Sequence, residues 1–312
     1  MFLKHLINPR PPIILLFFVF CIIFAVFPLL ESELSILFKH LHIPPAAILL
    51  SAIIIPFFLS IGLNNIIYEK NIIRKDNLVV GVVFILISCA FTNNIYAWVS
   101  AFLMLFLFNF LLESYQKDIP FSQFYNASFI LSILTFIYPN LIYLTLLFIV
   151  NGINYSNLNW RIIFTILLGL ITPYFFYFIF AFTTDITFVT PEFFNFSQIS
   201  RQHIQEMHLS KTIWWAILLV VMLFSFLELF MWLYKKSIKS RKTFLTIIWF
   251  FIISILIAIC SGAEYFYFSL IPLAIIVGNY FVYTKNRKTA NILFSLLMIS
   301  SFVYKYLNAY NV

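Results

Sequence analysis

The chain has few charged residues, few glycines and few cysteines, and each shortage excludes a class of protein. Charged residues make up 10% of its 312 residues, whereas a soluble domain carries about a quarter. The sequence contains no Gly-rich phosphate loop, no nucleophile elbow and no HExxH motif. Its three cysteines lie inside apolar stretches without ligand-like spacing, which supports neither a disulfide framework nor a metal site. A water-soluble domain is therefore excluded.

Apolar residues dominate instead. Hydrophobic residues make up 63% of the chain and aromatic residues 21%, and no polar stretch is long enough to fold alone, so residues 1–312 are predicted to form a single transmembrane domain. An apolar helix of about 20 residues spans the hydrocarbon core. The predicted fold is therefore an all-α polytopic transmembrane helix bundle of about 11 segments. They cover residues 12–30, 46–67, 78–92, 95–112, 125–138, 141–153, 162–183, 212–234, 243–261, 268–283 and 290–307.

Three of these segments, 78–92, 125–138 and 141–153, are shorter than the roughly 17 residues of a full crossing. We expect them to be half-crossings, or helices that meet at depth inside the bundle. The boundaries at residues 91–94 and 138–140 would be the bends of two short helical hairpins. Pro139 removes a backbone donor there, and Asn side chains can satisfy the freed groups.

The distribution of basic residues predicts the orientation. With the N-terminus in the cytoplasm, fifteen of the 19 Lys and Arg fall on the inner side, and only Lys39, Arg201, Lys211 and Lys305 fall outside. The excess of cytoplasmic Lys and Arg found in membrane proteins favours this orientation. Because the number of segments is odd, the C-terminus is predicted to lie on the external, periplasmic side.

The net charge of +8 follows from two basic clusters, at residues 235–242 and 285–288, together with scattered inner-side cations. In a membrane protein such clusters are expected to anchor the chain beside anionic lipid of the inner leaflet, with partner binding as the lesser alternative. Membrane lipid is the expected partner, membrane-protein partners are a further alternative, and nucleic acid is not expected.

Two polar segments, residues 31–45 and 184–211, are predicted to face the same external compartment and can therefore converge. The first contains two acids, Glu31 and Glu33. The second contains the polar residues Asp185, Arg201, His203, His208 and Lys211.

The end of the second segment, SRQHIQEMHLSK, has two interpretations. It can be a helix on the membrane surface that covers the bundle. Alternatively, Arg201 and Lys211 contact a lipid phosphate while His203 or His208 assists proton transfer. The histidine spacing does not fit a zinc motif, so no metal and no cofactor are expected. Glu264, at the outer end of another segment, is either a cavity-lining acid or a plain interface residue.

Several stretches resemble an uncharacterised family of bacterial polytopic inner-membrane proteins. They are QFYNASFILSILTFIYPNLIYLTLLFIV, LNWRIIFTILLGLITPYFFYFIF, YFYFSLIPLAIIVGNYF and TANILFSLLMIS. The resemblance includes an aromatic-Pro bend, a Trp160-Arg161 turn and a Thr172-Pro173-Tyr174 span. It implies a multi-pass protein of the bacterial inner (cytoplasmic) membrane and carries no established activity.

The chain more distantly resembles the C-type glycosyltransferase superfamily, membrane enzymes that use polyprenyl-phosphate sugars at the external side. The parallels are the cytoplasmic N-terminus, an external loop after the first span, short paired helices and a large later external loop. This resemblance implies that Glu31 or Glu33 acts as base on the acceptor. Here Glu31 and Glu33 stand where an Asp-Glu or Asp-Asp pair is often seen.

Three functions follow from these patterns. The first is a glycosyltransferase that uses a polyprenyl-phosphate-linked sugar, with Asp185 and Glu264 as further substrate contacts. The second is a non-catalytic membrane scaffold, or a subunit of an envelope assembly or secretion complex, on the same fold. The third, translocation of lipid or lipid-linked sugar, would need a polar path across the bundle, for which few residues are present.

Overall fold

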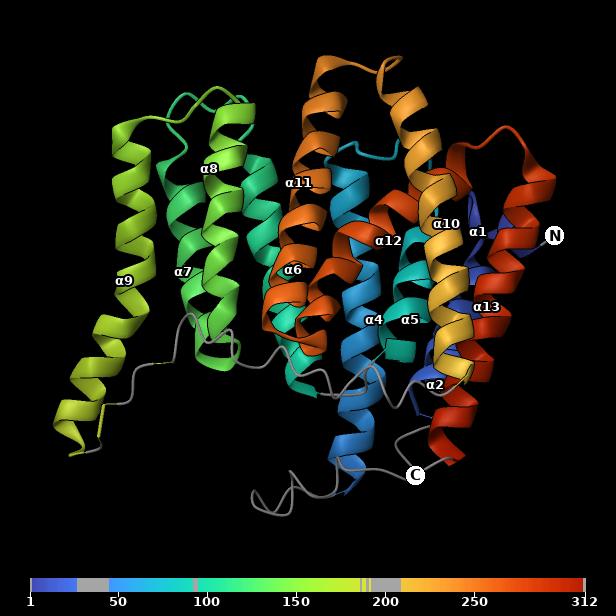
Figure 1. Cartoon of the computed structure of the whole chain (residues 1–312), viewed down its shortest axis with the longest axis horizontal. Coiled ribbons are helices and arrows are strands. Elements are labelled where there is room, and N and C mark those ends of the chain that lie inside the picture. Colours follow the sequence, from blue (N-terminus) through green and yellow to red (C-terminus); the bar gives the residue numbers. More distant parts are fainter. Residues whose placement is uncertain are drawn as a thin grey trace. The chain divides into compact units, whose positions relative to one another are not determined.

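The computed structural model describes residues 2–26, 45–91, 95–185, 187–188, 191 and 209–310. These residues are helical with short connections, and they contain no strand apart from an isolated bridge between Ile7 and Asn77. Figure 1 shows the arrangement of the helices along the chain. The predicted all-α class is therefore confirmed for the described residues.

The helices follow the apolar runs closely. They are α1 (Phe2–Leu6), α2 (Pro11–Val26), α4 (Pro45–Glu69), α5 (Val79–Phe91), α6 (Ile95–Glu113), α7 (Phe121–Ile137), η1 (Pro139–Leu144), α8 (Thr145–Asn154), α9 (Trp160–Thr183), α10 (Leu209–Leu233), α11 (Ile238–Ser261), η3 (Ala263–Tyr265), α12 (Phe266–Tyr283) and α13 (Arg287–Tyr310). Each predicted segment overlaps one of these helices, except that the segment 141–153 covers parts of both η1 and α8, and residues 27–30 of the first segment lie outside the described residues. The predicted hairpin bend at Pro139 is where α7 ends and η1 begins.

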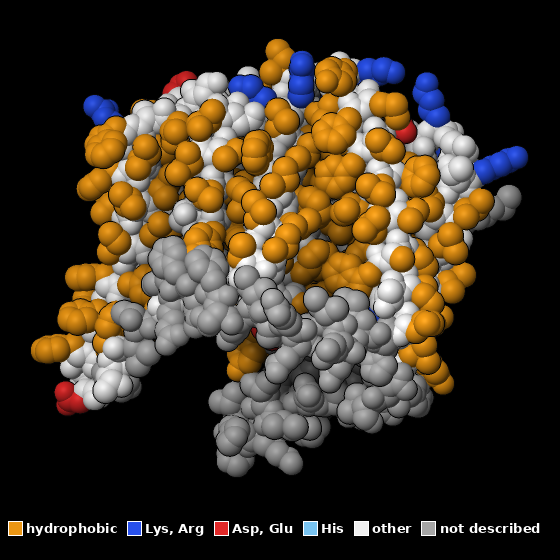
Figure 2. All heavy atoms as spheres, in the orientation of Figure 1, with side chains coloured by type: hydrophobic (Ala, Val, Ile, Leu, Met, Phe, Trp, Pro, Cys, Tyr) orange, Lys and Arg blue, Asp and Glu red, His pale blue; other side chains and the backbone are white. Residues whose placement is uncertain are grey.

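Six helical stretches of the described chain are long and apolar enough to cross a membrane: α6, α9, α10, α11, η3 with α12, and α13. Many large apolar side chains of these helices are exposed, and Figure 2 shows hydrophobic side chains along the sides of the helices. Phe175, Phe182 and Leu227, for example, are 57%, 77% and 62% exposed. These features indicate a multi-pass membrane protein in contact with lipid. The number of crossings stays a prediction.

The chain divides into two compact units. Unit 1 contains residues 1–99, 201–236 and 270–312, and unit 2 contains residues 100–200 and 237–269. Two of the four boundaries, at residues 99/100 and 269/270, fall inside α6 and α12.

The core of unit 1 lies between α5 and the part of α12 from residue 270 onward. Residues 79–90 of α5 are all buried, as are residues 270–282 of α12. Gly278 allows the two helices to meet, because a Cβ atom there would lie 2.5 Å from Cγ2 of Val80. Around this core α4 packs on α2 and α5, and α13 packs on α5 and α10.

In unit 2, α7 and α9 approach closely and share a row of polar contacts. At Gly169 a Cβ atom would lie 2.0 Å from Oγ of Ser128, so only glycine permits this approach. Beside it, Ser132 Oγ donates to the Leu170 carbonyl at 2.6 Å, and the hydroxyls of Thr135 and Tyr174 lie 2.5 Å apart. Small and hydroxylated residues are the usual means of joining helices in a membrane.

Short connections bring several basic residues of each unit together at one end of its helices. In unit 1, Leu78 N–H donates to the Leu6 carbonyl and Arg74 N–H donates to Tyr283 Oη, which joins the basic N-terminal segment, the loop after α4 and the end of α12. In unit 2, Asn154 Nδ2 donates to the Lys242 carbonyl, and Lys239 Nζ lies 6.0 Å from the Tyr115 ring centroid. We call these the basic ends. The side of the membrane on which they lie stays a prediction.

Candidate functional site

At the opposite end of unit 1, the last two turns of α13 hold the end of α2 and the start of α10. Trp214 Nε1 on α10 donates to Ser301 Oγ at 3.0 Å, and the Trp214 ring stacks on Tyr304 with 5.3 Å between centroids. On α2, the Phe24 ring meets Phe302 edge to face at 4.8 Å. Residues 301–305 of α13 therefore join the two helix ends. We call this region the outer end of unit 1, after the external side on which the sequence predicts it to lie.

Both predicted external segments connect to the described chain at this outer end. The first described stretch stops at Val26, two residues after Phe24, and the last resumes at Leu209, five residues before Trp214. The chain positions flanking residues 31–45 on one side and 184–211 on the other are thus held together by one helix. The sequence predicted only that the two segments share a compartment.

Lys305 lies at the centre of this region and is 5% exposed. Its Nζ donates to the Phe24 carbonyl and lies 4.5 Å from the centroid of the Phe24 ring. The carbonyls of the last helical turn have no partner within their own helix. Lys305 therefore supplies a partner, and a positive charge, to the negative C-terminal end of α2.

A lysine in an apolar bundle is costly, so such residues usually have a polar partner or a function. The partners of Lys305 among the described residues are the Phe24 carbonyl, the Phe24 ring and, electrostatically, the buried thiol of Cys89 on α5. None of these is a carboxylate. The outer end therefore has a surplus of positive charge among the described residues, which favours an anionic group nearby.

Lys211 adds a second cation to the outer end. It is half-buried in the first turn of α10, three residues before Trp214, so the two side chains share one face of the helix. The N-terminal end of a helix is itself electropositive, because its first N–H groups have no helical partner. Lys211 and this helix end reinforce each other in attracting an anion.

The remaining predicted site residues are not brought to this place by the described structure. Asp185 follows α9 with φ 52° and is exposed, and Glu264 is exposed in η3; both belong to unit 2. Near Glu264, the rings of Tyr138 and Tyr265 meet edge to face at 5.7 Å. The remaining five lie outside the described residues: Glu31, Glu33, Arg201, His203 and His208.

The described residues contain no group of three or more His, Cys, Asp or Glu side chains that could hold a metal ion. Comparison with known proteins then gives one result: a family model matches residues 12–312. The chain belongs to DUF6427, a family of unknown function. No curated protein and no solved structure matches it.

In this DUF6427 chain, sequence reasoning missed the role of Lys305. It treated that residue only as one of four basic residues on the external side. The sequence does contain a sign that Lys305 is unusual: this lysine interrupts the apolar run at residues 290–307, between Tyr304 and Tyr306. The hydrogen-bond partner of Lys305 could not be predicted from the sequence, because Phe24 lies 281 residues away along the chain.

Proposed function

We propose that the protein acts at the external face of the membrane on a lipid carrying a phosphate-linked sugar, as a glycosyltransferase that uses a polyprenyl-phosphate donor. The observation that carries the proposal is the outer end of unit 1. There α13 holds together the chain ends that lead into both polar external segments, next to Lys305 and Lys211.

Each proposed residue has a chemical role in this reaction. Glu31 or Glu33 accepts the proton of an acceptor hydroxyl as its oxygen attacks the anomeric carbon of the sugar. The bond between that carbon and the phosphate oxygen breaks, and the polyprenyl phosphate leaves with the bonding electrons. Arg201 and Lys211 stabilise the negative charge that develops on this phosphate. The reaction uses no metal or cofactor.

The other residues assist. His203 or His208 assists proton transfer, and Asp185 and Glu264 contact the substrate. Lys305 is a positioning residue, because it fixes the end of α2 from which the segment with Glu31 and Glu33 continues.

The test uses the full chain in proteoliposomes with a polyprenyl-phosphate sugar and measures transfer to an acceptor. A positioned general base contributes about 100- to 10,000-fold to a rate, so Glu31→Gln combined with Glu33→Gln should lower transfer by at least about 100-fold. Lys211→Gln should mainly weaken use of the donor. The matched control is Glu69→Gln with Asp118→Asn, which removes two acids from inner loops.

Retained transfer in the Glu31→Gln, Glu33→Gln variant would remove these acids from the mechanism. Absence of any transfer by the unaltered protein over a panel of polyprenyl-phosphate sugars would sink the enzyme proposal. That second outcome would leave the non-catalytic scaffold.

The scaffold function is favoured by one observation of its own. Among the described elements α9 packs chiefly on α7, and it leaves a broad aromatic face exposed, including Phe175, Phe176 and Phe182. Such a face suits either lipid or the helix of a partner membrane protein. Replacing these phenylalanines by leucine would distinguish lipid contact from a partner helix. A face that contacts lipid accepts either side chain, whereas a face matched to a partner helix would bind that partner more weakly after the replacement.

A further inference from the structure

Three basic residues contact one tyrosine at the basic end of unit 1, two through their ammonium groups and one through its backbone N–H. Lys236 Nζ lies 4.9 Å from the centroid of the Tyr283 ring and 4.3 Å from that of Trp232. Lys75 Nζ lies 5.3 Å from the Tyr283 ring centroid, and the backbone N–H of Arg74 donates to Tyr283 Oη at 3.0 Å. We call Arg74, Lys75 and Lys236 the tyrosine cluster.

The cluster comes from segments that are distant in the sequence and are fixed by their own hydrogen bonds. The loop after α4 carries Arg74 and Lys75, and Asn77 Nδ2 donates to the Lys75 carbonyl at 2.8 Å. Asn64 Nδ2 holds the Asn77 carbonyl at 2.6 Å. The N-terminal segment closes the other side, because Asn8 N–H donates to the Asp76 carbonyl at 2.8 Å. Arg74 and Lys75 are therefore on an ordered loop that hydrogen bonds hold in place, and Lys236 reaches them from the end of α10.

The three charges repel one another and lack a balancing partner. None of them forms a salt bridge with an acid of the described residues. Burial, and then the charges of Arg74 and Lys75, lower the pKa of the Lys236 ammonium from its usual value. The cation–π contacts with Tyr283 and Trp232 offset this repulsion only in part. An anion placed among the three would relieve it.

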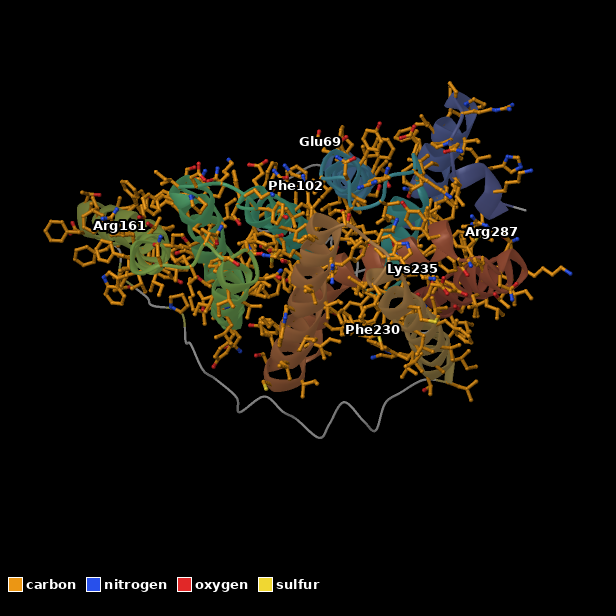
Figure 3. All side chains as sticks on the ribbon, turned by 90° about the horizontal axis from the view of Figure 1, so that it is seen from above. Glu69, Phe102, Arg161, Phe230, Lys235 and Arg287 are labelled. Carbon is orange, nitrogen blue, oxygen red and sulfur yellow. The ribbon has the colours of Figure 1, made fainter. Side chains whose placement is uncertain are left out.

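The other basic residues at this end are different. The Arg287 guanidinium is occupied at the end of α12, where Nη1 and Nη2 donate to the Phe281 and Val282 carbonyls at 3.0 and 3.2 Å. Lys235, Lys285 and Lys288 are exposed, as Arg74 and Lys75 are, but unlike Lys75 and Lys236 they lie over no aromatic ring of the described residues. Figure 3 looks onto this end and labels Lys235 after α10 and Arg287 at the start of α13. The tyrosine cluster combines two lysines over aromatic rings with a loop held by hydrogen bonds.

We propose that Arg74, Lys75 and Lys236, arranged around Tyr283, form a binding site for a phosphate group. Arg and Lys are the usual phosphate ligands, Arg through paired donors and Lys as a point charge. The phosphate comes either from the headgroup of an anionic lipid or from a free phosphate compound. Trp232 and Tyr283 end two membrane-crossing helices, which places the cluster at the depth of lipid headgroups.

The experiment compares two full-length variants of equal charge. The cluster variant carries Arg74→Gln, Lys75→Gln and Lys236→Gln. The matched control carries Lys235→Gln, Lys285→Gln and Lys288→Gln, which removes the same charge from exposed positions at the same end. Native mass spectrometry in detergent measures retention of phosphatidylglycerol, with phosphatidylcholine as the neutral lipid.

Each cation near a membrane surface contributes about a fivefold gain in binding of anionic lipid, and both variants lose this general attraction equally. We expect the cluster variant to retain phosphatidylglycerol at least about tenfold more weakly than the control, because it also loses the directed contacts. Phosphatidylcholine retention should not change. Equal losses in the two variants would overturn the proposal, since diffuse charge would then explain the binding.

A second arm identifies the source of the phosphate. Inorganic phosphate is added to the delipidated protein, with sodium sulfate of equal ionic strength as the salt control, and the unfolding temperature is measured. A rise with phosphate that the cluster variant lacks indicates a free phosphate compound. Retention of phosphatidylglycerol without that rise in unfolding temperature indicates a lipid headgroup. If the unaltered protein neither retains phosphatidylglycerol nor unfolds at a higher temperature with phosphate, the proposed site is contradicted.

Tyr283→Phe separates a built site from simple charge. It keeps the ring and every cation but removes the Oη that accepts from Arg74 N–H. Binding of phosphatidylglycerol should fall several-fold although the charge is unchanged. If the triple cluster variant does not fold, Lys236→Gln against its neighbour Lys235→Gln gives the same comparison with one charge. None of these measurements depends on the proposed transferase activity.

Discussion

Lys305 carries a buried charge, whose burial costs free energy. Its ammonium is 5% exposed and its partners are a carbonyl and a ring, without a described carboxylate. A buried charge that is balanced only by neutral groups contributes little net stability. The residue is therefore better explained by what it positions, which is the end of α2 before the first external segment.

Lys305→Met tests this explanation. Loss of the buried charge is favourable by about 2.5–3.5 kcal/mol at a helix centre and less near an end, while loss of a charged hydrogen bond costs about 1.5–3 kcal/mol. The two effects nearly cancel, so the free energy of unfolding should change by less than about 1.5 kcal/mol. Denaturation in detergent measures this, and transfer activity should fall although the protein remains folded.

Lys288→Met, an exposed substitution on the same helix, is the control for Lys305→Met. A loss of more than about 3 kcal/mol in the Lys305 variant would show that the lysine is mainly structural. Unchanged transfer activity would show that it does not position the site.

A buried amide, Asn151, joins helix α8 to two other helices of unit 2. Asn151 Nδ2 donates to the Leu111 carbonyl at 3.2 Å and to Ser114 Oγ at 3.1 Å, and its Oδ1 accepts from Thr246 Oγ1 at 2.9 Å. This side chain ties a short helix to the end of α6 and to α11. A short apolar helix without such ties would have only weak packing to hold it in place.

Asn151→Leu should therefore destabilise unit 2. Hydrogen bonds between membrane helices average about 0.6 kcal/mol each, so the loss of three of them gives an expected loss of about 2 kcal/mol. The measurement is the unfolding midpoint in detergent. Ile153→Ala, at a position that is 63% exposed, should change it little, and an equal shift in both variants would contradict the role of the amide.

The helices could be predicted from the sequence, but their contacts could not. Lengths of apolar runs are local, so the segment at residues 243–261 lies within α11 and the bend at Pro139 separates α7 from η1. By contrast, the tyrosine cluster combines residues 74, 75, 236 and 283, and no pattern of spacing reveals that they meet. The predicted external site stays a prediction, because Glu31, Glu33 and Arg201 lie outside the described residues.

For the molecule as a whole, the arrangement of charge predicts its orientation in the membrane. Within each unit the inner-side basic residues of the sequence gather at one end of the helices, whereas Lys211 and Lys305 lie at the other end of unit 1. Because basic residues are in excess on the cytoplasmic side of membrane proteins, we predict that the basic ends lie in the cytoplasm.

Reporter fusions test this orientation. Alkaline phosphatase fused after residue 312 should be active because the C-terminus is predicted to be external, and a fluorescent protein that folds only in the cytoplasm should be dark there. Fusions at residue 118, between α6 and α7, should give the reverse pattern and serve as the internal control. Fluorescence of the C-terminal fusion would mean an even number of crossings.

The bond between Lys305 and Phe24 also has a consequence for biogenesis. It joins the second helix made to the last one, across 281 residues. During synthesis the carbonyls at the end of α2 enter the membrane long before the ammonium that serves them exists. Unit 1 likewise receives its helices from the beginning, middle and end of the chain. Its outer end can therefore be completed only after α13 has been synthesised, so the last carbonyls of α2 lack this partner in the nascent chain until α13 inserts.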